Sequence, residues 1–129
     1  MKCLISSGSF KDVYTSAEAC RTIRDILPTG YDAVTLPVCD GGDYTYSILK
    51  DFFGGKAREI IVPDVFNPYG AKVTSHYLAV DGTAWVVSSE ILHLTPEEDS
   101  YKNPLYLSDY GLGQLIAHAA AEGFRDIRL

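Results

Sequence analysis

The chain has 129 residues, of which 47% are hydrophobic and 22% charged, a balance typical of a globular domain rather than of a disordered segment. Its 17 acidic and 11 basic residues give a formal net charge of −6, which argues against a nucleic-acid-binding surface, because such surfaces are basic. Its three cysteines have no metal-ligand spacing, so neither a disulfide framework nor a zinc site is predicted. The sequence shows no secretory leader and no apolar run of membrane-spanning length, so we expect a cytoplasmic protein without a membrane partner.

The first half of the chain predicts alternating strands and helices. An apolar run at residues 2–6 indicates a strand, and Thr15 with Glu18 three residues later forms a capping box that opens a helix stopped by Pro28. A second apolar run, residues 33–38, leads into an amphipathic segment that two glycines end. This β-α-β-α order predicts an α/β fold with a Rossmann-like parallel sheet, in which the loops after the strands gather at one edge.

The second half has the alternation of apolar and polar residues that antiparallel strands show. Three segments carry it: residues 59–63, 72–80 and 83–87. Asp81 and Gly82 separate the last two segments as a two-residue hairpin turn. We therefore expect two lobes, an incomplete N-terminal α/β lobe over residues 1–62 and the start of a second α+β lobe over residues 63–129.

A helix and a strand are expected at the end of the sequence. Residues 96–99 are predicted as a polar loop, after which Ser108 or Asp109 would cap a helix that Gly123 ends. Residues 125–129 then have the character of a strand. Because a domain seldom stops at the start of such a crossover, we expect the chain to be truncated. Uncovered apolar surface would favour self-association.

The loop after the second predicted strand has the clearest chemical character. There Asp40 and Asp43 flank Gly41 and Gly42, where a strand leads into a helix. Glycines let the backbone approach a ligand closely, and carboxylates can accept a hydroxyl proton or hold a divalent ion. The alternative interpretation is a helix-capping loop, with Asp43 as the N-cap and the glycines as turn residues, and for Asp43 we expect this capping role rather than catalysis.

The loop after the first predicted strand, residues 8–12, should lie at the same edge of the sheet. It carries Lys11, which could therefore face Asp40 across a common cleft. The alternative for Lys11 is an exposed loop lysine. The histidines have no ligand spacing and are expected to be structural or surface residues rather than ligands of a metal centre: His76, His93 and His118.

Three stretches, in this order and spacing, resemble the glycerate kinase family, the bacterial type that phosphorylates D-glycerate with ATP. They are Ser9-Phe10-Lys11 followed by Ser16-Ala17; Pro37-Val38 with Asp40-Gly41-Gly42 and Thr45; and Asn103-Pro104-Leu105 leading to Tyr110-Gly111, Gly113 and Leu115-Ile116. The resemblance covers essentially the whole chain, and it implies that the chain is similar to the N-terminal part of such an enzyme.

The resemblance implies ATP-dependent phosphoryl transfer, with Mg²⁺, to a hydroxyl of D-glycerate or a related hydroxy acid. Asp40 would be the general base or a carboxylate that organises magnesium. Lys11 would contact the phosphate or the glycerate carboxylate. The other residues implied to bind substrate or phosphate are Ser9, Phe10, Gly41, Gly42, Thr45, Gly111 and Gly113.

The sequence departs from the family pattern at several positions, and it therefore supports more than one hypothesis. Family members usually carry other residues at Gly8, Asp12, Asp43, Tyr44 and Val87. Tyr44 stands where the family has glycine and could narrow the pocket, which would favour another sugar acid. The first hypothesis is a glycerate-kinase-like protein that is active only with a complementing C-terminal portion. The alternative is a non-catalytic relative that binds a small carboxylate or a partner subunit.

Overall fold

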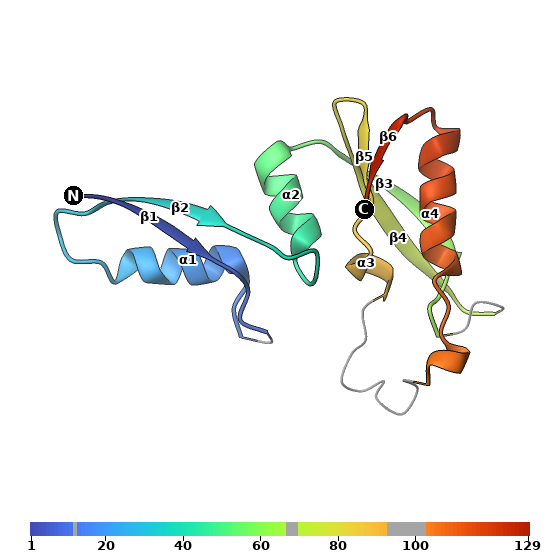
Figure 1. The fold of residues 1–129 in the computed structure, drawn as a ribbon, viewed down its shortest axis with the longest axis horizontal. Helices are drawn as coiled ribbons and strands as arrows, with labels where there is room; N and C mark the ends of the chain where they lie inside the picture. Colours follow the sequence, from blue (N-terminus) through green and yellow to red (C-terminus); the bar gives the residue numbers. More distant parts are fainter. Residues whose placement is uncertain (12, 67–69, 93–102) are drawn as a thin grey trace. The chain divides into compact units, whose positions relative to one another are not determined.

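The computed structural model in Figure 1 describes residues 1–11, 13–66, 70–92 and 103–129. The chain divides into two compact units, Met1–Phe52 and Phe53–Leu129. This division falls earlier in the sequence than the boundary between the predicted lobes, residues 1–62 and 63–129, which stay a prediction. His93 and the predicted polar loop at residues 96–99 lie outside the described residues.

The first unit contains a two-stranded parallel sheet. Strands β1 (Lys2–Ser7) and β2 (Asp32–Pro37) pair in parallel along their whole length. Helix α1 (Ser16–Asp25) connects the two strands and packs against both of them, while α2 (Thr45–Phe53) follows β2 (Figure 1). The predicted β-α-β-α order and its parallel sheet are confirmed.

The start of α1 is fixed by the predicted capping box. The Thr15 side chain accepts a hydrogen bond from the Glu18 backbone N–H at 3.2 Å, and the Thr15 N–H donates to Glu18 Oε2 at 2.9 Å. These bonds satisfy donors that a helix start would otherwise leave without partners. The hydrogen bonds from Thr15 also lower the pKa of the Glu18 carboxyl.

The second unit contains a four-stranded mixed sheet. Its strands lie in the order of their numbers: β3 (Lys56–Pro63), β4 (Lys72–Val80), β5 (Thr83–Trp85) and β6 (Asp126–Arg128). The first three are antiparallel, and β5 and β6 are parallel. Asp81 and Gly82 both have positive φ, at 46° and 84°, as the predicted two-residue hairpin turn requires.

Helix α4 (Tyr110–Ala121) covers the second sheet and contacts β3, β4 and β6. Two short elements precede it, α3 (Ser89–Leu92) and the 3-10 helix η2 (Pro104–Tyr106). The buried core of this unit comes from the sheet, α3, α4 and the residues between them: Val62, Tyr77, Ala84, Val86, Ile91, Leu115 and Ala119. Of the helices in the described parts of the chain, none combines the length and apolar character needed to cross a membrane.

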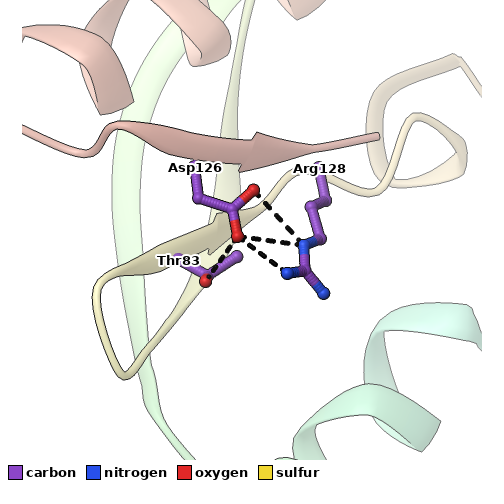
Figure 2. Close-up of polar contacts among 3 residues, drawn as sticks. All are labelled: Thr83, Asp126 and Arg128. Carbon is purple, nitrogen blue, oxygen red and sulfur yellow. Dashed lines mark hydrogen bonds and ion pairs between the residues drawn. The ribbon is translucent and has the colours of Figure 1, made fainter.

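Polar and aromatic contacts fix β6 to its neighbour β5. Asp126 Oδ2 accepts a hydrogen bond from Thr83 Oγ1 at 3.0 Å and pairs with Arg128 Nη2 at 2.8 Å (Figure 2). The Arg128 guanidinium also lies 4.8 Å from the centre of the Trp85 ring, which stacks on Phe53 at 5.4 Å. Hydrogen bonds from Arg128, and secondarily from Thr83, lower the pKa of the Asp126 carboxyl.

Candidate functional site

The carboxyl ends of β1 and β2 lie side by side, because the parallel register pairs Ser7 with Pro37. The Val38 N–H then donates to the Ser7 carbonyl at 3.2 Å, which holds the start of the second loop against the end of β1. The two loops that follow the strands therefore meet at one edge of the sheet, as the sequence predicts, and this is where open α/β sheets bind ligands.

A cavity of about 220 Å³ lies between these two loops. Both loops contribute to its wall, which consists of Gly8, Ser9, Val38, Cys39, Asp40 and Asp43. Two carboxylates and a hydroxyl thus line one small space, a set that can hold a divalent ion or orient a hydroxyl group. Within the described residues, no group of three or more His, Cys, Asp and Glu is arranged to hold a metal ion.

The Asp40 carboxylate is oriented by its own loop. Its Oδ1 accepts a hydrogen bond from the Gly42 N–H at 3.0 Å, and Gly41 between them has a φ of 94°. A Cβ on Gly42 would lie only 3.1 Å from this oxygen, so glycine keeps the contact unstrained. This bond uses one lone pair, and the remaining acceptor positions of the carboxylate can still serve a ligand.

Ser16 on α1 holds the start of the loop that follows β2 and contains Asp40 and Asp43. Its side chain is 1% exposed, and its Oγ donates to the Val38 carbonyl at 2.8 Å. The capping box fixes the first turn of α1, and this turn places the Ser16 hydroxyl within hydrogen-bond distance of the Val38 carbonyl. This role of Ser16 was not predicted, although a small polar residue directly after a helix N-cap was the available signal.

The capping role predicted for Asp43 does not hold. Helix α2 begins at Thr45, so Tyr44 rather than Asp43 precedes the helix directly. Tyr44 has a φ of 66°, which extends the turn by one residue and leaves Asp43 in the wall of the cavity. The Thr45 side chain is 7% exposed, and its hydroxyl has no hydrogen-bond partner among the described residues.

Two other predicted residues lie outside the wall of this cavity. Lys11 is exposed, in the turn that a hydrogen-bonded bridge between Phe10 and Tyr14 closes. The Phe10 side chain lines a different hollow of about 280 Å³, which is apolar. The neighbours of Phe10 there are Val13, Tyr14, Ala19, Thr22 and Ile23. The functional roles of Lys11 and Phe10 stay predictions.

Two of the four glycines predicted as binding residues, Gly111 and Gly113, lie on α4 in the second unit. A Cβ on Gly111 would collide with the Pro63 carbonyl oxygen and come within 2.6 Å of Ile91 Cδ1, so packing alone requires glycine there. Gly113 is exposed and has free space around it. Close to these glycines, a hollow of about 390 Å³ is lined by Val65, Leu92, Leu107, Ser108 and Asp109. Ligand binding by the two glycines stays a prediction.

The start of α4 confirms part of the predicted cap. Asp109 holds the N-cap position without a side-chain hydrogen bond, and the Ser108 hydroxyl accepts the bond from the Tyr110 N–H at 3.2 Å.

The two described histidines have protein partners. His76 Nε2 lies 3.1 Å from Glu90 Oε2, and His118 Nδ1 lies 3.3 Å from the Tyr77 hydroxyl, whose pKa is raised mainly by burial.

A parallel β-α-β-α unit with a carboxylate-lined cavity at its strand ends defines an α/β protein of the kind that binds small molecules. The sequence matches the glycerate kinase family over residues 3–129, and the chain belongs to that family.

Relatives of known sequence and structure agree with this membership. A glycerate kinase from Haemophilus influenzae is 36% identical over 124 residues, which are 90% of this chain and 31% of that enzyme. A glycerate kinase from Halalkalibacterium halodurans is 33% identical, over 98% of this chain and 34% of its own length. A crystal structure described as glycerate kinase 2 from Salmonella typhimurium LT2 superposes with a TM-score of 0.69 at 25% identity, over 98% of this chain and 34% of that one. The chain therefore spans about a third of the length of its relatives.

Proposed function

We propose that this chain takes part in ATP-dependent phosphoryl transfer to a hydroxyl of D-glycerate, together with polypeptide equivalent to the two thirds of the relatives that it does not span. The observation that carries the proposal is the cavity lined by Asp40, Asp43 and Ser9 at the shared strand ends of a glycerate kinase family member. The names of the relatives supply the substrate class.

The size of the cavity supports the need for a second polypeptide portion. Ligand pockets usually measure about 300–1,000 Å³, and this one measures about 220 Å³. It can enclose a three-carbon acid or the phosphate end of a nucleotide, and it is too small for both. Binding of the complete nucleotide would require groups from outside this chain.

The residues at the cavity fit the chemistry of phosphoryl transfer. Asp40 would accept the proton of the attacking hydroxyl, since its loop fixes the carboxylate and leaves acceptor positions open. Asp40 and Asp43 also fit Mg²⁺, which proteins often hold with one or two carboxylates and the phosphates of the substrate. When bound, Mg²⁺ would neutralise charge on the transferring phosphoryl group. Two residues of the same unit that do not line the cavity could add to this set: Thr45 has a buried hydroxyl without a partner among the described residues, and Lys11 carries a positive charge.

The first experiment is a coupled assay of ADP release with D-glycerate, ATP and Mg²⁺. It compares the chain alone with the chain co-expressed with the portion of the Haemophilus influenzae enzyme outside the matched region. We expect ADP release only from the combination. Absence of turnover in the combination, with both polypeptides present and folded, would contradict the proposal.

Substitution of Asp40 tests its role within that assay. If Asp40 is the general base, Asp40→Asn should lower turnover by about 10²–10⁴-fold, the usual contribution of general base catalysis. Asp25→Asn is the matched control, because Asp25 lies on α1 with its side chain 58% exposed. Undiminished turnover of Asp40→Asn would show that another group is the base.

The second candidate function is that of a non-catalytic relative that binds a small carboxylate or a partner subunit. Tyr44 favours it, since a bulky residue replaces the family's glycine beside the cavity. Titration calorimetry with D-glycerate separates the two functions. Binding of D-glycerate that depends on the cavity residues, without ADP release from the combination, would favour the binding protein.

A further inference from the structure

Val38 is held through both of its backbone polar groups, at the point where β2 passes into the loop that carries Asp40. Its N–H donates to the Ser7 carbonyl at the end of β1 at 3.2 Å, and its carbonyl accepts from the Ser16 hydroxyl on α1 at 2.8 Å. Pro37 ends β2 and has no N–H of its own to donate. The loop therefore leaves the sheet from a residue that β1 and α1 fix together.

The Ser16 hydroxyl is well placed for this contact. Its side chain is 1% exposed, so water cannot readily replace the hydroxyl as the partner of the Val38 carbonyl. Cys20 lies one turn further along the same side of α1 and is fully buried. Its Sγ donates to the Ile5 carbonyl at 3.8 Å, within β1. Ser16 thus contacts the segment that leads to Asp40, while Cys20 contacts a strand.

The position of Val38 determines how the two walls of the polar cavity face each other. Ser9 follows the end of β1 on one side, and Asp40 follows Val38 by two residues on the other. The Gly42 N–H fixes the Asp40 carboxylate relative to its own loop, at 3.0 Å. The bond from Ser16 fixes that loop relative to the rest of the unit.

We propose that Ser16 is a positioning residue, which holds the Asp40 carboxylate in place through the Val38 carbonyl. The proposal rests on the proposed function, in which Asp40 accepts the proton of the attacking hydroxyl. Ser16 itself is not part of the cavity wall, so it acts through the backbone of Val38. Placement matters because a shift of about 1 Å in a catalytic group can lower a rate by about 10²-fold.

The kinetic test introduces Ser16→Ala into the chain co-expressed with the portion of the Haemophilus influenzae enzyme outside the matched region. We expect kcat for ADP release to fall at least about tenfold, with KM for D-glycerate unchanged within about twofold, because a base acts in the transition state. Cys20→Ala is the matched control, since it removes a buried contact from the same side of α1 and should keep kcat. Unchanged kcat in Ser16→Ala, or an equal loss in both variants, would overturn the proposal.

The structural test uses nuclear magnetic resonance on the 129-residue chain alone and needs no kinase activity. In Ser16→Ala we expect the Val38 amide to exchange its proton at least about tenfold faster and the amide signals of residues 39–43 to shift. Cys20→Ala should change neither. Ser16→Cys keeps the size of the side chain with a much weaker donor and should give smaller changes in the same direction, which decides the case if Ser16→Ala does not fold.

The two tests separate failure of this proposal from failure of the proposed function. Absence of ADP release from the unsubstituted combination would contradict the proposed function, and the resonance measurement would still show whether Ser16 places the loop. Unchanged exchange and unchanged signals in the folded Ser16 variants would overturn the positioning role, whatever the activity.

Discussion

Tyr44 has a backbone conformation that favours glycine. Its φ of 66° lies in the left-handed region, where a Cβ costs about 1–2 kcal/mol. Asp81 also has a positive φ, but aspartate tolerates it better because its short side chain can bond locally. The resemblance predicts glycine at position 44, and the backbone supplies a physical reason for that preference.

Replacing Tyr44 should therefore stabilise the first unit. We expect Tyr44→Gly to raise the free energy of unfolding by up to about 1 kcal/mol, because relief of strain exceeds the extra entropy of glycine in the unfolded chain. Urea denaturation followed by circular dichroism measures this difference. Tyr44→Ala is the control, since it removes the ring but keeps the strain. A gain of equal size in both variants would assign the effect to the ring.

Among the elements of the fold, those with local sequence signals could be predicted. The Thr15–Glu18 capping box and the Asp81–Gly82 turn are set by short-range contacts, and both are present. Helix α3 and η2 were missed, because four and three residues are too few to show a period. The topology predicted that the two loops meet. It could not predict that Phe10 lines a separate hollow, since side-chain direction in an irregular loop depends on tertiary contacts.

Helix α4 provides a matched pair of glycines for a packing test. Gly111→Ala should lower the free energy of unfolding by about 1–3 kcal/mol, because the new methyl group collides with the Pro63 carbonyl and the helix must shift. Gly113→Ala should raise it by up to about 1 kcal/mol, because the site is open and alanine favours the helix. Thermal and urea denaturation of both variants check this. A neutral Gly111→Ala would mean that α4 does not approach β3 this closely.

The contacts between β5 and β6 predict a dependence of stability on pH. Asp126 has a lowered pKa in the folded chain, while its unfolded pKa is about 3.9. The unfolded state therefore binds the proton more readily. The stabilisation is complete above about pH 4 and is lost as the pH falls through the lower folded value.

We expect the melting temperature to fall more steeply below pH 4 in the unsubstituted chain than in Asp126→Asn. Arg128→Gln should flatten the profile similarly, because it removes the main cause of the lowered pKa. Some dependence will remain in both variants, since the pKa of Glu18 is also lowered. Identical slopes in all three proteins would show that the Asp126–Arg128 pair contributes nothing to stability.

At the scale of the whole molecule, the two units differ in how completely they are buried. The second unit contains large side chains without any exposed surface, such as Tyr77, Leu78 and Leu115. The first unit has fewer such residues, and Leu4 and Val34 in its sheet are 64% and 62% exposed. Stability should therefore be uneven along the chain, because local opening depends on buried apolar contacts.

Native-state hydrogen exchange should detect this difference. We expect amides in β3 and β4 to exchange at least about tenfold more slowly than those in β1 and β2, a difference equivalent to about 1.4 kcal/mol. In the complex with the portion of the Haemophilus influenzae enzyme outside the matched region, the protection of amides in β1 and β2 should rise. Uniform protection throughout the isolated chain would show that the two units unfold together.

Trp85 provides a fluorescence signal with which unfolding of the second unit can be followed separately from unfolding of the first. It is the only tryptophan in the sequence, and it contacts both Phe53 and the Arg128 guanidinium, all within the second unit. Intrinsic fluorescence excited at the indole band therefore reports on that unit alone. Cys20, fully buried in the first unit, gives a second signal as the slow phase of the absorbance change with a thiol reagent, because Cys3 and Cys39 in the same unit are more accessible. The unsubstituted protein thus carries one optical probe for each half.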